Sequence, residues 1–238
     1  IFTDAEHPYT QKLLAAIPSG KAPESDEVRE PLITASNLKT YFQTQSGNEP
    51  VKAVDDVSLE IKRGEVLGLV GESGSGKSTF GRSLLRLTPI TDGNVTFDGI
   101  YVGALGRNDL KVLRRRMQMI FQDPYASLNP RMTVYDTLAE PLLLHNIATR
   151  STLDAAIKSL MNDVGLASAF AKKYPHEFSG GQRQRIAIGR ALATKPEFIV
   201  ADEPVSALDV TIQAQILDLL KDLKDEYGLT MLFVSPGL

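Results

Sequence analysis

The segment "GESGSGKST", residues 71–79, constrains the fold more than any other stretch of the sequence. It matches the pattern G-x-x-x-x-G-K-[ST], and it lies between an apolar run at 65–71 and a helical pattern at 77–87. Glycines let the backbone curl so that successive N–H groups point at one anion, and the start of the following helix adds positive potential. The sequence therefore predicts a strand, a phosphate loop (residues 71–79) and a helix.

Two side chains of the phosphate loop have specific expected contacts. Lys77 can reach the β- and γ-phosphates of a nucleoside triphosphate, and the Ser78 hydroxyl can ligate Mg²⁺. The alternative is an ordinary turn rich in glycine and serine, against which the flanking strand and helix argue. The other predicted nucleotide contacts are Gly71, Ser73, Gly74, Ser75, Gly76 and Thr79.

Strand and helix patterns alternate along most of the chain. Short apolar runs at 65–71, 117–122, 197–202 and 230–235 predict buried strands, and the clearest helical pattern spans 209–224. This alternation predicts an α/β fold with a mostly parallel sheet that is covered on both faces. Residues 32–62 and 91–99 look instead like turns and strands of an antiparallel piece.

Composition excludes some classes of function. The net charge of −3 gives no support to a broadly basic surface for nucleic acid, so no nucleic-acid partner is expected. Cysteine is absent, which excludes disulfides and thiolate metal sites. The basic run at 114–116 is expected to be a solvated helix end.

Two adjacent acids follow the apolar run at 197–202. Ligands in open α/β sheets bind at the carboxyl ends of the strands, where Asp202 and Glu203 are predicted to lie. Asp202 can join the Mg²⁺ shell, and Glu203 can orient or deprotonate an attacking water. The alternative is a solvated acidic turn.

A second anion site is predicted at residues 179–181. Ser179 and two glycines open a helical pattern, so free N–H groups and a hydroxyl gather at the positive end of a helix. A plain N-cap is the alternative, because serine is a good capping residue.

The segment "FSGGQRQRIAIGRAL" (178–192), together with the phosphate loop, Gln122 after "MIF" and "VADEPVSALD" (200–209), closely resembles the ATP-binding subunit of ABC transporters from about residue 33 to 235. The segment "MIFQDPYASLNPRMTV" is similar to the corresponding segment of the branch that imports peptides, nickel and glutathione. The resemblance implies a P-loop NTPase core, an antiparallel β subdomain and an inserted helical subdomain at about 124–178.

The resemblance also implies roles for particular residues. Glu203, Gln122 and Lys77 would be catalytic, with ATP and Mg²⁺ as cofactors, and Gln122 would sense the ion and the attacking water. The metal ligands would be Ser78, Gln122 and Asp202. Phe42 fits best as the aromatic residue that stacks on adenine, with Tyr41 as the close alternative and ordinary strand packing as a third reading. The signature segment, Ser179, Gly180, Gly181 and Gln182, would act in trans, and the bridge segment, Ser206, Ala207, Leu208 and Asp209, would join the two halves of a dimer.

The implied function is an ATPase that powers import of peptides or related small solutes from the cytoplasmic face of the membrane. Its partners would be a second ATPase domain, head to tail, transmembrane permease subunits and, indirectly, an extracytoplasmic solute-binding protein. One alternative is a soluble ABC ATPase of DNA maintenance, which would carry long coiled coils, whereas the stretch between Gln122 and Ser179 has no sustained heptads. Another is a nucleotide-binding module that has lost hydrolysis.

The chain departs from the family pattern in two places. Residues 6–18 resemble a segment that normally follows the ATPase core, so residues 1–20 are expected to be the tail of a preceding ATPase domain, 21–31 a linker, and 32–238 an ABC ATPase domain truncated at its C-terminus. The family has a histidine after the last strand, where this chain has Pro236 followed by Gly237. A natural degenerate site and a truncation with altered terminal residues remain open as explanations.

Overall fold

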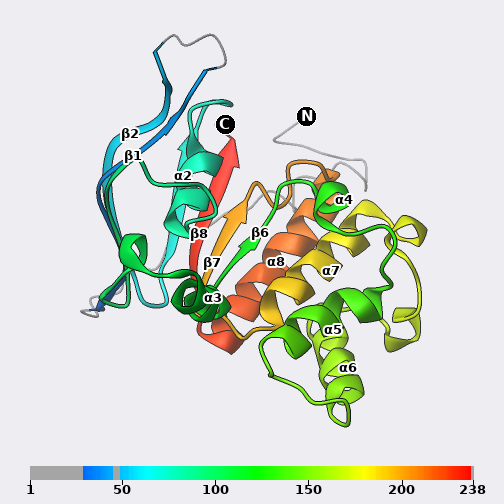
Figure 1. The fold of residues 1–238 in the computed structure, drawn as a ribbon. Coiled ribbons are helices and arrows are strands. Elements are labelled where there is room, and N and C mark those ends of the chain that lie inside the picture. Colours follow the sequence, from blue (N-terminus) through cyan, green and yellow to red (C-terminus); the bar gives the residue numbers. More distant parts are fainter. Residues whose placement is uncertain (1–28, 45–48, 237–238) are drawn as a thin grey trace, which may run out of the picture.

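The computed structural model describes residues 29–44 and 49–236. The predicted tail at 1–20 and most of the predicted linker at 21–31 lie outside the described residues. Two four-stranded sheets and the helices around them make up the described part of the chain (Figure 1).

One sheet is antiparallel and comes from the region predicted to be an antiparallel piece. β1 and β2 form its long hairpin, and β4 pairs with the other edge of β1. The strand order is β2-β1-β4-β5. The strands are β1 (Pro31–Phe42), β2 (Val51–Lys62), β4 (Asp92–Phe97) and β5 (Ile100–Tyr101).

The other sheet is parallel, with strand order β3-β8-β7-β6. Its strands correspond to the four predicted apolar runs, so the α/β prediction is confirmed. They are β3 (Val66–Gly71), β8 (Thr230–Pro236), β7 (Phe198–Asp202) and β6 (Met117–Ile120). Because all four run the same way, their carboxyl ends lie at one edge of the sheet, where the phosphate loop begins.

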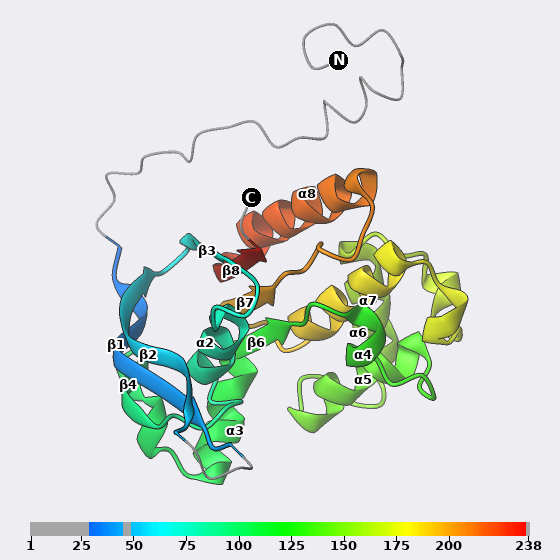
Figure 2. The ribbon, with the colours of Figure 1, turned by 90° about the horizontal axis from the view of Figure 1, so that it is seen from above.

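Alternate side chains of the parallel strands enter two separate cores. In β7, Phe198 and Val200 pack with α2, α3 and the antiparallel sheet, whereas Ile199 and Ala201 pack on the face covered by α7 and α8. Figure 2 shows α8 and α2 on opposite sides of the sheet. The elements on these two faces are α2 (Lys77–Leu84), η1 (Val102–Ala104), α3 (Arg107–Arg116), α7 (Gly180–Leu192) and α8 (Val210–Tyr227).

Short helices occupy the stretch between Gln122 and α7, and Figure 1 shows α5 and α6 at the lower right and α4 at the upper right. Their apolar side chains share one core with α7 and α8. The longest have 11 residues, which is too short for the long coiled coils of the DNA-maintenance alternative. The elements are α4 (Pro124–Ser127), α5 (Val134–Leu144), α6 (Leu153–Asp163), η2 (Ser168–Phe170) and η3 (Pro175–Glu177).

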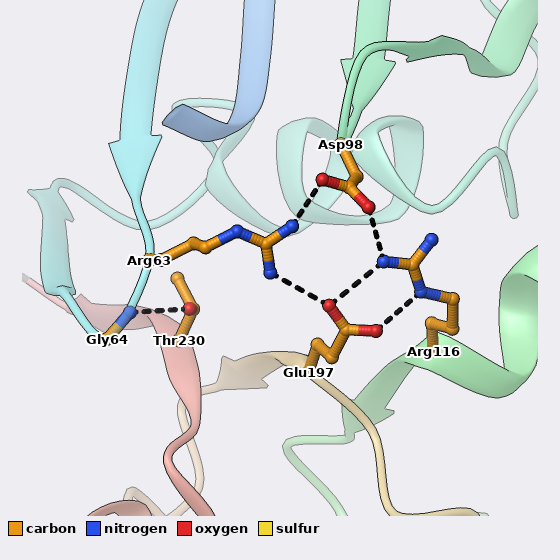
Figure 3. Close-up of polar contacts among 6 residues, drawn as sticks. All are labelled: Arg63, Gly64, Asp98, Arg116, Glu197 and Thr230. Atoms are coloured by element: carbon orange, nitrogen blue, oxygen red, sulfur yellow. Dashed lines mark hydrogen bonds and ion pairs between the residues drawn. The ribbon is translucent and has the colours of Figure 1, made fainter. Parts of the chain in front are cut away.

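A charge ring of Arg63, Asp98, Arg116 and Glu197 joins the two sheets (Figure 3). Arg116 donates to both oxygens of Glu197, at 2.5 and 2.9 Å, and to Asp98 at 2.6 Å. Arg63 donates to Glu197 at 2.9 Å and also to Asp98. The ring lies where β6 and β7 begin, at the edge of the parallel sheet opposite to the phosphate loop. It therefore fixes the antiparallel sheet to the core without entering the nucleotide site.

The prediction of a solvated basic run at 114–116 is wrong for two of its three residues. Arg116 belongs to the charge ring, and Arg114 donates to the carbonyls of Leu85 and Arg86. Only Arg115 is exposed. The local charge pattern could not reveal this, because the partners come from other segments of the chain.

We expect the charge ring to stabilise the fold in a pH-dependent way. Hydrogen bonds from Arg116 and then Arg63 hold the pKa of Asp98 and of Glu197 below their usual values. The stabilisation is therefore complete above the unfolded pKa of about 4 and disappears as the pH falls through the lower folded pKa. Arg116→Met should lower the free energy of unfolding by about 1 kcal/mol at neutral pH, a value limited by solvent screening, and by less in acid.

Denaturant titrations at neutral and acidic pH would measure this change, with Arg115→Met as the matched control that leaves the free energy of unfolding unchanged. Arg116 also lies over the Phe97 ring, 4.7 Å from its centroid. An equal loss at both pH values would assign the effect to this packing and contradict the electrostatic prediction.

Candidate nucleotide site

The phosphate loop is held against the antiparallel sheet by a close backbone contact. Gly76 has φ 93°, and a Cβ there would lie 1.9 Å from the carbonyl oxygen of Ala53. Ala53 lies where the register of β1 and β2 shifts, between the pairs Thr40–Val54 and Tyr41–Lys52. Only glycine fits at position 76, so the loop has a defined position relative to β2.

The Lys77 side chain folds back onto the start of the phosphate loop. Its Nζ donates to the carbonyls of Gly71 at 2.6 Å and Glu72 at 2.7 Å, and it is 3.5 Å from Ser75 Oγ. The side chain is buried. The loop therefore keeps an ammonium group beside its own N–H groups, which is the arrangement that a bound phosphate requires.

Ser78 and Asp202 meet beneath the loop. Ser78 Oγ donates to Asp202 Oδ1 at 2.7 Å, and Asp202 is completely buried. Asp202 Oδ2 has no hydrogen bond with any described residue and lies 3.7 Å from Nη2 of Arg82. A hydroxyl and a buried carboxylate oxygen are ligands that Mg²⁺ prefers. The described residues contain no group of three or more His, Cys, Asp or Glu side chains that could hold a metal, so phosphate oxygens and water would complete the shell.

Arg82 was missed by sequence reasoning. It follows Ser78 by four residues on α2, so the two side chains lie on the same face of the helix, and both contact Asp202. The four-residue spacing was the available signal.

Gln122 and Glu203 form the second polar pair of the site. Gln122 Nε2 donates to Glu203 Oε2 at 2.6 Å. β6 ends at Ile120, two residues earlier than predicted, because its pairing with β7 ends there, and Gln122 lies in the loop that follows. Glu203 has φ 44°, a left-handed conformation that is unfavourable for glutamate and that the surrounding structure must hold in place. The adjacent carboxylates of Asp202 and Glu203 thus have different partners, Ser78 and Gln122.

Ser179 and Gln182 of the signature segment cap α7 together. Ser179 Oγ accepts from the N–H of Gln182 at 3.3 Å, and Gln182 Oε1 accepts from the N–H of Ser179 at 3.0 Å. The plain N-cap considered as an alternative is therefore present, and the Gln182 side chain is part of this capping interaction. This cap also orders the start of the helix, where free N–H groups can meet an anion.

The two glycines of the signature segment lie in tight packing contacts, of which that at Gly181 leaves no room for a side chain. A Cβ on Gly181 would lie 2.5 Å from Ile212 Cγ2, and a Cβ on Gly180 would lie 3.2 Å from Leu208 Cδ2. The signature and bridge segments are therefore neighbours. Within the bridge segment, Ser206 Oγ donates to the Glu203 carbonyl and Asp209 caps α8. Because α7 and α2 lie on opposite faces of the parallel sheet, the signature segment is separated from the phosphate loop of its own chain.

The two aromatic candidates differ in how free their rings are. The Tyr41 hydroxyl donates to Asp55 at 2.5 Å, which raises the pKa of Tyr41 to about 12, and Lys52 lies 5.6 Å from the ring centroid. Phe42 is 44% exposed and pairs with Val51, on the stretch of β2 that leads to the loop contact. This geometry favours Phe42 for adenine, because its ring is less engaged.

Pro236 lies beside the start of the phosphate loop. β8 ends at this residue, which pairs with Gly71 in the parallel register. Position 236 therefore lies beside the residue at which the phosphate loop starts, and proline provides no donor there.

Comparisons with known proteins agree with this geometry. A model of the family described as ABC transporter matches residues 54–206. The oligopeptide transport ATP-binding protein OppF of Bacillus subtilis (strain 168) is 57% identical over 211 residues, which are 88% of this chain and 68% of that protein. The glutathione import ATP-binding protein GsiA of Pectobacterium atrosepticum is 46% identical over a match that covers 100% of this chain and 43% of that protein.

A comparison with solved structures supports the same family. A dimeric structure of the ATP-binding cassette MJ0796 with ADP and Pi aligns with a TM-score of 0.76 and 33% identity, over 85% of this chain and 87% of that one. The chain spans between 43% and 68% of the length of the curated relatives named above.

Proposed function

The chain belongs to the ABC transporter family, and from this membership we propose that it is the ATP-hydrolysing subunit of an importer for peptides or related small solutes. The observation that carries the proposal is the meeting of the phosphate loop, Asp202 and the Gln122–Glu203 pair at one edge of the parallel sheet. The names of the two curated relatives, an oligopeptide and a glutathione transport protein, support the class of cargo.

This proposal assigns a role to each polar group of the site. The N–H groups of the phosphate loop and the Lys77 ammonium bind the phosphates of ATP, and Phe42 stacks on adenine. Ser78 and Asp202, with Gln122 at the edge, hold Mg²⁺, which offsets phosphate charge when bound. Glu203 accepts the proton of the attacking water, and Gln122 holds that carboxylate in place through its 2.6 Å hydrogen bond.

We further propose that the working unit is a head-to-tail dimer, in which residues 179–182 complete the site of a second ATPase domain. The separation of the signature segment from its own phosphate loop supports this arrangement. The bridge segment, residues 206–209, packs beside the signature segment, so it would also lie at the dimer interface. The match to the glutathione import protein covers the whole chain, whereas the match to the oligopeptide transport protein covers 88% of it, and we propose that residues 1–20 are a tail and residues 21–31 a linker.

The permease would bind at a cavity of about 680 Å³ between the core and the short helices. Gln122 is one of its lining residues, so a permease segment in this cavity would contact the loop that carries Gln122. Apolar and charged groups both line it, among them Leu87, Met119, Leu144, Arg114, Glu140 and His145. In the described part of the chain, no helix is both long and apolar enough to cross a bilayer. From the family membership, we propose a peripheral location on the cytoplasmic face of the membrane.

Lys77→Ala tests the nucleotide site. Because the variant removes a charged donor to phosphate, it should weaken Mg-ATP binding by about 10- to 100-fold. Calorimetry on the full-length protein would measure the affinity, with Lys221→Ala, an exposed lysine on α8, as the matched control. Unchanged affinity in Lys77→Ala would contradict the proposed cradle.

The module with lost hydrolysis remains the second candidate function, because Pro236 supports it. ATP turnover by the full-length protein distinguishes the two.

A further inference from the structure

We propose that Tyr125 and Arg183 are positioning residues that connect the Gln122 loop of one nucleotide site to the signature segment that serves the partner's site. The inference rests on the proposed head-to-tail dimer and extends it, because it assigns a physical connection between the two nucleotide sites.

The connection begins at Gln122. The next residue, Asp123, is the N-cap of α4, and its carboxylate accepts from the N–H of Tyr125 at 2.7 Å. The position of the Tyr125 ring is therefore fixed by the same short stretch of backbone that carries Gln122.

The Tyr125 ring lies against the guanidinium of Arg183. Cζ of Arg183 is 3.7 Å from the ring centroid, a close cation–π contact. Arg183 belongs to α7 and follows Ser179 by four residues, so it lies one helical turn beyond the signature cap.

Arg183 also holds the chain that leads into the signature segment. Its Nε donates to the Pro175 carbonyl at 2.6 Å, and Nη2 donates to the His176 carbonyl at 3.3 Å. The Arg183 side chain, near the start of α7, thus contacts both the Tyr125 ring of α4 and the backbone at residues 175–176.

The ring face of Tyr125 compensates for an incompletely satisfied charge. Arg183 is 6% exposed, and its buried Nη1 has no hydrogen bond with any described residue. A buried guanidinium with an unpaired N–H is unfavourable unless another group offsets the charge, and the face of an aromatic ring does so. Tyr125 itself is 64% exposed, so its substitution removes this interaction while disturbing little core packing.

A second contact attaches the other end of α4 to α7. Arg190 Nη1 donates to the Ser127 carbonyl at 2.5 Å. Arg190 follows Arg183 by seven residues, which places both on the same face of α7. The one-turn helix α4 therefore contacts α7 at both ends, and it connects the Gln122 loop to α7.

This arrangement predicts which property depends on the stack. Neither Tyr125 nor Arg183 is part of the phosphate loop, so binding of ATP to a single domain should not require them. Closure of the dimer should require them, because it needs the signature segment to be correctly placed against the partner's ATP.

The test uses full-length protein with Glu203→Gln, so that bound ATP persists. One measurement is the Mg-ATP affinity of dilute, monomeric protein, and the other is the dimer dissociation constant with ATP by sedimentation. Tyr125→Leu should leave the first within twofold and weaken the dimer about tenfold, whereas Tyr125→Phe, which keeps the ring, should match the parent. Arg183→Lys should weaken the dimer at least as much as Tyr125→Leu, because it also disturbs the hydrogen bonds to the Pro175 and His176 carbonyls, and the combined variant should be no weaker than Arg183→Lys alone.

The inference would be overturned by a dimer unaffected by Tyr125→Leu, by an equal loss in monomer ATP affinity, or by additive losses in the combined variant. The melting temperature of Tyr125→Leu should stay near that of the parent, and a large decrease would assign Tyr125 a merely structural role. Each of these leaves ATP binding and dimerisation by the parent intact. A parent that binds no ATP would instead overturn the proposed function and this inference together.

Discussion

Replacing Glu203 by glutamine should lower ATP turnover by about 10²- to 10⁴-fold and leave ATP binding intact, because an amide cannot accept the proton of the attacking water. The substitution preserves side-chain length, and glutamine can still accept the hydrogen bond from Gln122 through its own oxygen. The geometry of the pair is thus retained while its basicity is lost. Phosphate release by full-length protein and equilibrium ATP binding, measured in parallel, would separate the two effects.

Glu203→Asp is the matched control. Aspartate keeps the carboxylate and tolerates the left-handed conformation at φ 44° better than most residues, but its carboxylate is one methylene shorter and further from Gln122. Its turnover should fall between those of the parent and Glu203→Gln. If Glu203→Gln hydrolysed ATP at the parental rate, another group would be the base.

The parts of the site that depend on local sequence could be predicted without a resemblance. The phosphate loop, its strand and its helix are contiguous in the chain, so glycine spacing and apolar flanks are sufficient to identify them. Asp202 could be placed at the ligand-binding edge because it follows a buried strand. The contact between Gln122 and Glu203, in contrast, joins residues 81 positions apart. Only the family resemblance brought these two side chains together before the structure did.

Contacts between segments with no distinctive pattern could not be predicted. The charge ring depends on how four segments meet at the amino ends of the parallel strands, and each of its residues looks like an ordinary surface charge in the sequence. The packing of Gly181 on Ile212 is similar, because a glycine at a helix start is first read as a cap or an anion site. Long-range packing rather than local propensity determines both features.

Pro236→His should raise ATP turnover by up to about 10²- to 10³-fold, which is the typical effect of one donor aimed at developing charge. Position 236 pairs with Gly71 at the start of the phosphate loop, so a histidine there can reach the region of the γ-phosphate. In the family resemblance, this residue bridges the γ-phosphate and the catalytic carboxylate. Proline has neither a side-chain donor nor a backbone N–H, although Lys77, Ser78 and Asp202 remain available to bind Mg-ATP. We therefore expect the protein with Pro236 to bind ATP and hydrolyse it slowly.

Pro236→Ala is the control that separates the two properties of proline, because alanine restores the backbone N–H without adding a side-chain donor. If the imidazole is the missing group, only the histidine variant should gain turnover, and ATP affinity should change little in either variant. An equal gain in both would assign the defect to the missing N–H at the end of β8. Fast hydrolysis by the parent, unchanged by Pro236→His, would show that another group already performs the task expected of the histidine.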